Sequence, residues 1–356
     1  STATAQTDLA VPLKLTEYIE DKVYTRATVE KTYEQVVKDL LEAENYLKGI
    51  SRKSVTRTSH QATCLMLSRV YLYMQNYAEA VKWAKACLEE QSNLTDLNGF
   101  QGEMFLNQSS PELIFTMGSN YIGYNLTQKA GNFSASDDLM KCYSENDLRK
   151  QFFFGAVEEG VYKYTKVFTT YGIREISDNF ILRTAEAYLN LAEAAACLGN
   201  EYTTEAQNAY NTLRKHRFPN YTEEHFLTGK ALVEAIRLER RRELCFEGHR
   251  FMDLRRTRNM MQLNGLQKYG VEAIAINEDG SEMDIAEATR KAKTYSLTPD
   301  NFKYILRMVP ISAIAENKFL IQESYYFFPI QESKILENPN LEQNNNWGGK
   351  FNPTME

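Results

Sequence analysis

The sequence has few of the residues and motifs that mark specialised protein classes. Its 356 residues include five cysteines, two tryptophans, four histidines and eight prolines. No apolar stretch approaches the roughly 18 residues that a membrane-spanning helix requires. The net charge of −6 at pH 7 argues against nucleic-acid binding, which needs a basic surface. A serine-nucleophile elbow, a phosphate-binding glycine loop and an HExxH zinc motif are all absent from the sequence.

The scarce cysteines and histidines also argue against a metal or disulfide framework. The five cysteines lie far apart and include no CxxC pair, so we expect them to be buried apolar side chains: Cys64, Cys87, Cys142, Cys197 and Cys245. His249 could act as a base or ligand, but no second histidine or cysteine lies at coordinating spacing. We therefore expect neither a metal ion nor another cofactor.

What remains is an ordinary globular composition, with 43% apolar and 25% charged residues. At roughly 100–200 residues per domain, the length allows about two domains or one large domain with insertions. The chain begins at Ser1 rather than at a methionine, so we expect a processed or trimmed product. The polar, unpatterned first residues predict an extended lead-in.

Three segments then follow with the periodicity of amphipathic helices. In residues 28–47, apolar side chains recur at steps of four and three, which places them on one helix face. Thr28 is suited to be the N-cap of this helix, and Gly49 is suited to end it. Two more helices are expected, one after Ser59 and one from Asn76.

The second and third helices carry the spacing of a tetratricopeptide repeat. A large residue, a small residue and a tyrosine precede small residues on the next helix: Leu67, Ser68, Tyr71, Tyr77, Ala80, Ala84 and Cys87. Two antiparallel helices approach closely only where small side chains lie at their crossing. The pattern recurs later in the chain, at Tyr188, Leu191, Ala192, Ala195, Ala206, Tyr210 and Leu213. Ala80 and Ala206 are 126 residues apart instead of the 34 of a tandem array, so a long insertion separates the two hairpins.

These patterns predict an all-α fold of tetratricopeptide-like helix hairpins, with long loop-rich insertions and little β-structure. We expect four segments. Residues 1–90 hold the lead-in and first hairpin region, and 91–176 form a loop-rich insertion with a short strand at ELIFTMG. Residues 177–260 hold the second hairpin and an Arg-rich helix, and 261–356 form a C-terminal loop-rich region. Long loops on a rigid scaffold favour 91–176 as the ligand face.

The Arg-rich stretch is the strongest concentration of charge. Between Arg237 and Arg258 there are eight arginines and four acids. A phosphate or nucleic-acid site is one interpretation, but acids interleaved at helical spacing favour ion-pair ladders on a partly buried helix. The expected pairs are Glu239 with Arg242, Glu247 with Arg250, Arg250 with Asp253 and Asp253 with Arg256.

Aromatic residues give the best candidates for ligand contact. The chain has 22 tyrosines, which suit both helix contacts and sugar-like ligands. Tyr121 and Tyr124, with Asn120 and Asn125, lie in a glycine-rich part of the insertion and offer rings for stacking and amides for hydroxyl groups. A second set alternates in VYKYTKVF and equally suits a strand with one buried face: Tyr162, Tyr164, Phe168 and Tyr171. No two acids are placed as glycosidase catalysts would be, so we expect no catalysis.

Three stretches together resemble the SusD/RagB family of outer-membrane nutrient-binding lipoproteins. They are NFILRTAEAYLNLAEAAACLGN, RRRELCFEGHRFMDLRR and FFPIQESKILENPNLEQNNNWGG, in the same order as in the family. The last lacks the proline that follows QN in the family pattern. Family members are longer and begin with a signal peptide, a lipidated cysteine and further helices, so the resemblance implies that an N-terminal part precedes Ser1.

The resemblance implies a non-enzymatic function at the cell outer membrane. A surface-exposed lipoprotein would bind an oligosaccharide or other nutrient and deliver it to a SusC-like, TonB-dependent transporter. Membrane association would depend on an N-terminal lipid not present in this chain. The alternative is a helical-repeat scaffold for protein interaction that has no small-ligand site.

Overall fold

The computed structural model describes two compact units of the chain. The described residues are 4–102, 104–117, 134–158, 161–167, 176–177, 180–257, 269–276 and 303–310. The first unit contains residues 1–15 and 26–252, and the second contains residues 16–25 and 253–356. The four segments predicted from the sequence remain a proposal.

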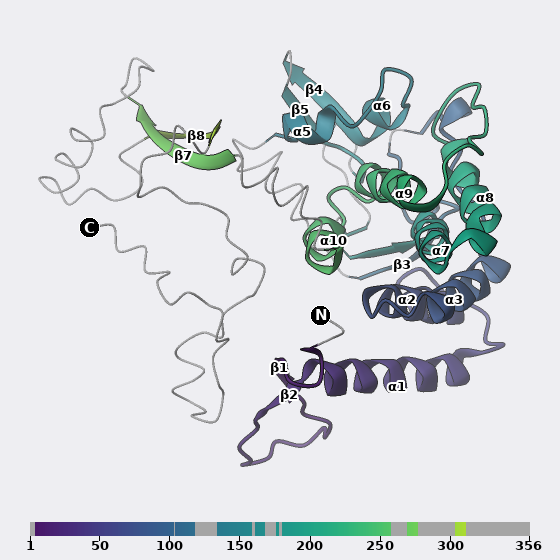
Figure 1. The fold of residues 1–356 in the computed structure, drawn as a ribbon, viewed down its shortest axis with the longest axis vertical. Helices are drawn as coiled ribbons and strands as arrows, with labels where there is room; N and C mark the ends of the chain where they lie inside the picture. The colour runs from purple at the N-terminus through teal and green to yellow at the C-terminus, as the bar shows by residue number, and fades with distance from the viewer. Residues whose placement is uncertain are drawn as a thin grey trace, which may run out of the picture. The chain divides into compact units, whose positions relative to one another are not determined.

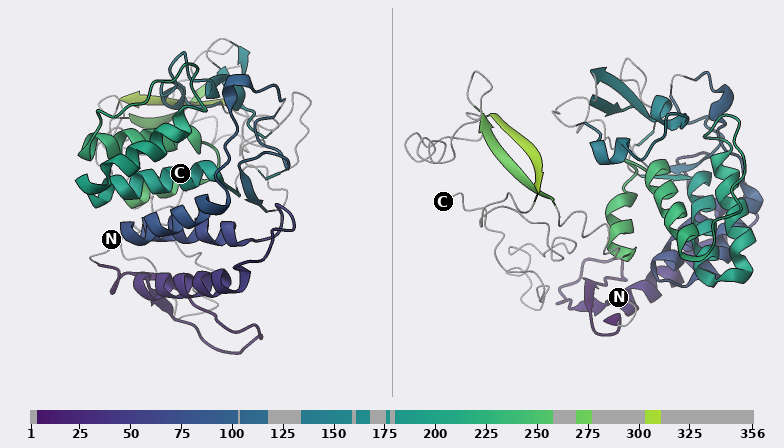
Figure 2. Two further views of the ribbon diagram at one scale, coloured as in Figure 1. Left: turned by 90° about the vertical axis from the view of Figure 1, so that its right-hand side faces the viewer. Right: turned by 45° about the horizontal axis from the view of Figure 1, so that its top comes forward.

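The first unit is built mainly from helices, which confirms the predicted all-α, tetratricopeptide-like class. The longer helices of this unit are α1 (Val29–Leu47), α2 (His60–Tyr73), α3 (Tyr77–Glu90), α7 (Thr184–Leu198), α8 (Thr203–Arg214) and α9 (Gly229–Glu243). They lie side by side, with α1 against α2, α3 against α7, and α7 against both α8 and α9 (Figures 1 and 2). The chain therefore stacks helix hairpins that are far apart in sequence.

Local sequence signals define the first two helices. The Thr28 hydroxyl accepts a hydrogen bond from the Lys31 amide at 3.2 Å, and Ser59 caps α2 in the same way. The α1 helix ends at Leu47, and Gly49 follows with a φ of +75° that favours glycine. The predicted boundaries of these helices are thus confirmed.

Alanine side chains lie at the helix crossings, as the spacing predicts. Ala80 and Ala84 on α3 and Ala192 and Ala195 on α7 are all 0% exposed. They belong to one apolar core that α2, α3, α7, α8 and α9 share. Small side chains at these positions let the helix backbones approach closely, so the core is set by tight packing of the hairpins.

Polar side chains join the same helices through the core. Asn190 on α7 donates to the Ser68 hydroxyl of α2 at 2.7 Å and accepts from Arg240 of α9 at 2.7 Å. Arg69 of α2 forms a bidentate ion pair with Glu186 of α7, with hydrogen bonds of 2.6 and 2.5 Å. These buried bonds are directional, so they fix the relative rotation of helices that apolar packing alone would leave freer.

Short antiparallel strand pairs accompany the helices. The pairs are β1 (Leu9–Pro12) with β2 (Arg26–Thr28), β3 (Leu113–Thr116) with β6 (Ile181–Arg183), β4 (Phe154–Glu158) with β5 (Val161–Tyr164), and β7 (Tyr269–Ile276) with β8 (Lys303–Pro310). β3 is the strand expected at ELIFTMG. Of these strands, the sequence predicts β3 and, at VYKYTKVF, β5; β7 and β8 belong to the second unit. Further short helices are η2 (Leu97–Gly99), α5 (Asp137–Met140), α6 (Arg149–Phe153) and η4 (Asn200–Tyr202).

The long Arg-rich helix expected up to about residue 260 is interrupted. α9 ends at Glu243, and α10 (His249–Thr257) begins after a five-residue turn. Within the turn, Phe246 has a φ of +62° and Gly248 a φ of +81°, which no α-helix accommodates. The side chain of Glu247 in this turn is buried, so tertiary contacts override the helical pattern of the sequence.

In the described part of the chain, no helix is both long and apolar enough to cross a membrane. All five cysteines lie in the described residues, and none forms a disulfide bond. Cys64, Cys87 and Cys245 are buried as expected, whereas Cys142 and Cys197 are partly exposed.

We predict that Ala80→Leu lowers the free energy of unfolding by about 1–3 kcal/mol, because the larger side chain overpacks the crossing of α3. Ala78→Leu on the same helix is the matched control, because Ala78 is exposed. Urea unfolding followed by circular dichroism measures both. Equal stability of the two variants would show that the crossing is not tightly packed.

Candidate functional site: a buried ion network and the inserted segment

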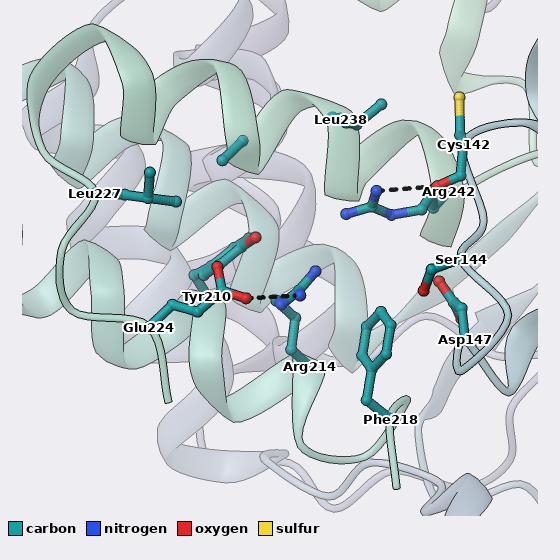
Figure 3. Close-up of a pocket in the computed structure, with 11 residues that line it drawn as sticks. Cys142, Ser144, Asp147, Tyr210, Arg214, Phe218, Glu224, Leu227, Leu238 and Arg242 are labelled. Atoms are coloured by element: carbon teal, nitrogen blue, oxygen red, sulfur yellow. Dashed lines mark hydrogen bonds and ion pairs between the residues drawn. The ribbon is translucent and has the colours of Figure 1, made fainter. Parts of the chain in front are cut away.

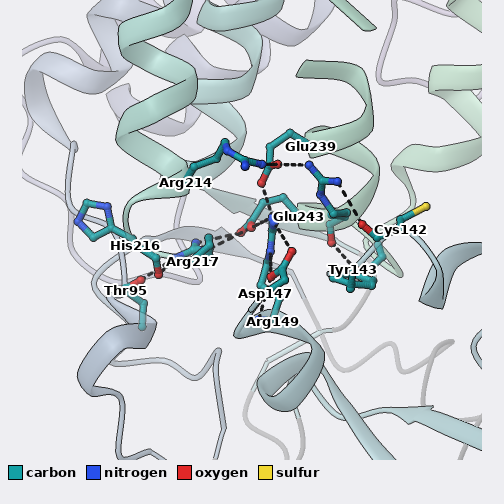
Figure 4. A network of polar contacts seen from close by, with 12 residues as sticks. Thr95, Cys142, Tyr143, Asp147, Arg149, Arg214, His216, Arg217, Glu239 and Glu243 are labelled. Carbon is teal, nitrogen blue, oxygen red and sulfur yellow. Dashed lines mark hydrogen bonds and ion pairs between the residues drawn. The ribbon is translucent and has the colours of Figure 1, made fainter. Parts of the chain in front are cut away.

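A buried ion network connects the inserted segment to the helix frame. Twelve of the described side chains form it: Arg149, Lys166, Arg183, Arg214, Arg217 and Arg242 with Glu112, Asp147, Glu224, Glu239, Glu243 and Glu247. Six cations face six carboxylates, so the network carries no net charge. Figure 4 shows its centre, where the side chains converge from separate elements.

Glu243, the last residue of α9, lies at the centre. Arg217 donates to both of its carboxylate oxygens, at 3.0 and 2.9 Å. Arg149 adds a bond of 3.0 Å to one oxygen, and Arg183 adds a bond of 2.6 Å to the other. The side chains of all four residues are 0% exposed. A carboxylate has about four acceptor sites, so Glu243 is fully hydrogen-bonded without water.

Glu239, one turn earlier on α9, is a second centre. Its carboxylate lies 2.6 Å from Arg149, 2.8 Å from Arg214 and 2.5 Å from Arg242. Arg149 thus pairs with both glutamates and links the two centres (Figure 4). Because Arg149 begins α6, this link attaches the insertion to α9.

Glu247 is the third centre and stabilises the turn after α9. Arg183 donates to both of its oxygens, at 2.9 and 2.8 Å. Lys166 donates to Glu247 at 2.6 Å and also to the backbone carbonyls of Glu243 and Cys245, at 2.9 and 3.1 Å. The ammonium group therefore satisfies carbonyls that the end of α9 leaves without helical partners.

This arrangement corrects part of the predicted ion-pair ladder. The pairs Glu239–Arg242, at 2.5 Å, and Asp253–Arg256, at 2.8 Å, are present. Glu247, however, pairs with Lys166 and Arg183 rather than forming the expected pair with Arg250. The turn at Glu247 removes the helical spacing on which that prediction depended.

The network keeps its central carboxyl groups ionised. Burial alone would raise the pKa of Glu243, but the charges of Arg217, Arg183 and Arg149 hold that pKa well below its ordinary value. Burial and arginine charges act in the same opposed way on Glu239, whose pKa is also lowered. Glu112 differs, since burial outweighs the charges of Arg217 and Arg183 and raises the pKa of its carboxyl group.

The network also fixes the position of the inserted segment. Arg149, which begins α6, and Lys166, which follows β5, are held by α9 and its turn, whereas Glu112, which precedes β3, is held by Arg217 and Arg183. An aromatic cluster packs beside these points, with the Phe105 and Phe153 ring centroids 4.7 Å apart. The described parts of the insertion are therefore held firmly in place.

The second aromatic set of the sequence analysis belongs in part to this support. Tyr162 and Tyr164 lie on β5, as the strand interpretation predicts. The Tyr164 ring is 0% exposed and stacks on Phe246 with centroids 4.8 Å apart, so it packs in the core and faces no ligand. Phe168 and Tyr171 lie outside the described residues.

The first candidate set lies outside the described residues altogether. Tyr121, Tyr124, Asn120 and Asn125 all fall between residues 118 and 133. The described residues on either side are Met117, which follows β3, and Ser134. Next to Ser134, the Ala135 amide donates to the Tyr162 carbonyl at 2.7 Å. Residues 118–133 thus begin and end on the part of the insertion that the ion network holds.

A pocket of about 290 Å³ lies at the edge of the ion network (Figure 3). Its lining includes Tyr210 and Arg214 of α8, Phe218, and Leu238 and Arg242 of α9. The Arg214 guanidinium lies 4.4 Å from the Phe218 centroid and 5.0 Å from that of Tyr210, and Arg149 also lies 5.5 Å from Phe218. These rings therefore contact guanidinium groups of the protein itself, which makes the pocket a poor platform for stacking a sugar.

Sequence reasoning did not identify the distant cations of the network. Arg149, Lys166 and Arg217 lie far in sequence from the glutamates with which they pair, so no periodicity or motif marks these pairs. One signal was available at Arg183, which directly follows the apolar residues FIL and precedes a helix. A charge within an apolar strand requires a buried partner.

The fold and the network define a class of protein: a stack of tetratricopeptide-like hairpins that supports a long inserted segment. The sequence model of the SusD family matches residues 111–347, more than half of the chain. A second model, described as starch-binding associating with outer membrane, matches residues 4–72. The chain belongs to the SusD family. A search of curated proteins gives no significant match.

Solved structures agree with this family. A SusD superfamily protein from Bacteroides thetaiotaomicron VPI-5482 is 23% identical with a TM-score of 0.66, covering 96% of this chain and 72% of that one. A SusD-like carbohydrate binding protein from Bacteroides vulgatus ATCC 8482 is 20% identical with a TM-score of 0.63, covering 94% and 70%. A SusD superfamily protein from Parabacteroides distasonis ATCC 8503 is 18% identical with a TM-score of 0.64, covering 94% and 74%. At these identities the likeness establishes the shared fold.

We predict that Glu243→Gln lowers the free energy of unfolding by about 3–5 kcal/mol, because it leaves three buried arginines short of a negative charge. Glu234→Gln on the same helix is the control, since its side chain is 51% exposed and lies 3.7 Å from Lys230. Chemical denaturation compares the two variants. A loss below about 1 kcal/mol for Glu243→Gln would contradict a cooperative network.

We also predict that acid destabilises the protein through this network. Lowered pKa values of Glu239, Glu243 and Glu247 mean that these groups contribute stability above the pKa of an unfolded glutamate. The contribution is lost as pH falls below about 4.3 and through the folded pKa values. Glu112, with its raised pKa, opposes this trend. Denaturation midpoints measured across this range test the prediction, and a midpoint that rises in acid would contradict it.

Proposed function

We propose that the protein is a non-catalytic binding protein of the cell surface that holds an oligosaccharide for a TonB-dependent outer-membrane transporter. Membership of the SusD family over residues 111–347 is the observation that carries this proposal. The match of residues 4–72 to a model described as starch-binding associating with outer membrane supports both the ligand class and the location. We further propose surface exposure as a lipoprotein that is anchored by an N-terminal lipid.

The physical basis of this function is a rigid support under a loop-rich face. Sugar binding by stacked rings requires rings that are already in place, because ordering a loop on binding reduces affinity. The helix hairpins and the ion network supply such order at both ends of residues 118–133. We propose Tyr121 and Tyr124 as the stacking rings, and Asn120 and Asn125 as partners for sugar hydroxyl groups.

The proposed roles of the parts of the chain follow the four segments predicted from the sequence. Residues 1–90 and 177–260 supply the helix frame, on which the transporter would dock. Residues 91–176 supply the ligand face, and residues 261–356 form the C-terminal region.

A protein-interaction scaffold is the second candidate. One feature favours it: α1 exposes apolar side chains on its outer surface, among them Tyr46 at 69% exposure and Leu41 at 38%. An exposed apolar surface of this kind is suited to contact with another protein. The two candidates differ in whether a small ligand binds.

We predict that the protein binds an oligosaccharide without cleaving it. Calorimetry against a panel of starch-type and other oligosaccharides measures binding, and chromatography of the same mixtures measures cleavage. Binding with an unchanged glycan supports the proposal, because a binding protein has no need of two converging acids. Shortened products would identify an enzyme, and no binding across the panel would favour the scaffold.

We predict that Tyr121→Ala and Tyr124→Ala each weaken this binding by about tenfold, the effect of losing about 1.4 kcal/mol of ring contact. Tyr46→Ala is the matched control, since Tyr46 is an exposed tyrosine on α1, away from the insertion. Wild-type affinity in both insertion variants would refute the assigned site while leaving the binding function intact.

A further inference from the structure

A histidine joins three helices at one end of the frame. His60 is the first residue of α2, and its side chain is 10% exposed. Its Nε2 atom lies 2.8 Å from the Glu44 carboxylate of α1, and its Nδ1 atom contacts the Glu90 carboxylate at the end of α3. Both ring nitrogens thus face acceptors. An imidazole can donate from both nitrogens only when it is protonated.

The contact matters because α1 has few other attachments. None of its side chains is fully buried, whereas α2 and α7 each bury most of theirs. Val37 and Leu40 of α1 pack against the shared core as partly buried residues. The C-terminal half of α1 is therefore held by limited apolar contact together with the bond from Glu44 to His60.

The other groups around His60 do not supply the second hydrogen-bond donor that protonation of the ring provides. Cys64, one turn along α2, lies with its Sγ atom 3.7 Å from Nε2 and 3.9 Å from Nδ1. Burial, together with the charges of Glu44 and Glu90, raises the pKa of the Cys64 thiol to about 12, so this group stays neutral. Burial also raises the pKa of the Cys87 thiol on α3. Lys48 at the end of α1 is the other charged group that acts here.

Two effects oppose a charge on His60, and two carboxylates outweigh them. The N-terminus of a helix disfavours a cation, and burial lowers the pKa of the imidazole. The hydrogen bonds and charges of Glu44 and Glu90 reverse this, so the pKa of His60 lies above its ordinary value. Among the described residues, no cluster of histidine, cysteine and acidic groups is arranged to hold a metal ion.

We propose that His60 is a proton-operated clasp that fixes the C-terminal half of α1 to the helix frame when its ring is protonated. When the ring is neutral, one nitrogen is an acceptor that faces a carboxylate, and either Glu44 or Glu90 loses its donor. The clasp is fully formed below the pKa of an unfolded histidine, about 6.5, and opens as pH rises through the folded value. Opening loosens α1, whose outer surface exposes Leu41 and Tyr46.

Hydrogen exchange with mass spectrometry tests the clasp on the whole chain. Protection factors for amides in residues 41–47, corrected for intrinsic exchange, are measured from about pH 6 to about pH 9, a range that brackets histidine titration. We expect protection in the wild type to fall by about tenfold across this range, on the scale of one charge-assisted hydrogen bond. Constant protection in the wild type would overturn the proposal.

Variants separate the clasp from general pH effects. His60→Gln should have low protection in residues 41–47 at every pH. His225→Gln is the matched control, because His225 is an exposed histidine that contacts a single carboxylate, Glu223, at 3.0 Å. In His225→Gln, the protection of residues 41–47 should depend on pH as it does in the wild type. A pH dependence of this protection that persists in His60→Gln would overturn the proposal.

A second variant keeps the test valid if His60→Gln does not fold. Glu90→Gln changes a side chain that is 38% exposed and removes one of the two carboxylates. We expect the pKa of His60, measured by NMR, to fall in this variant and the pH-dependent change in protection to shrink. An unchanged His60 titration would overturn the proposal.

Discussion

The structure depends on one carboxylate, that of Glu243, which receives hydrogen bonds from three arginines of different segments. Arg149 comes from the insertion, Arg183 from the strand before α7, and Arg217 from the segment after α8. Because Glu243 is the last residue of α9, its position fixes where the helix ends and where the turn to α10 begins. A buried charge in this position is stable only with all of its partners, so α9 and the three segments that supply these arginines must assemble together.

This constraint connects the frame to the proposed function. An insertion as long as residues 91–176 could pack against a helix stack in many ways by apolar contact alone. The ion network selects one arrangement, because each guanidinium fork meets a carboxylate in one orientation. The described residues on either side of 118–133 belong to this arrangement, because Met117 follows β3 and the Ala135 amide donates to the Tyr162 carbonyl. Under the proposed function, the affinity for a glycan would then not depend on ordering the whole insertion.

The helix frame could be predicted from sequence because its signals are local. Caps such as Thr28 and Ser59, the stop at Gly49 and the alanine spacing of Ala80 and Ala195 each depend on residues within a few turns. The ion network could be predicted only in part. Glu239 and Arg242 are three residues apart and pair as expected, whereas the partners of Glu243 lie 26 to 94 positions away. No spacing rule reaches that far, and the buried turn at Glu247 breaks the helical pattern that the prediction used.

The choice of cation at each site follows from the shape of its acceptors. Where the partner is a carboxylate, as at Arg183 and Arg217, a planar guanidinium offers two parallel donors, and both residues make such two-pronged bonds. Lys166 instead faces two backbone carbonyls and one carboxylate oxygen. An ammonium group has three donors, and that of Lys166 makes one hydrogen bond to each of these three acceptors. The network is therefore specific in donor geometry as well as in charge, and exchanging Lys and Arg within it would leave buried acceptors without partners.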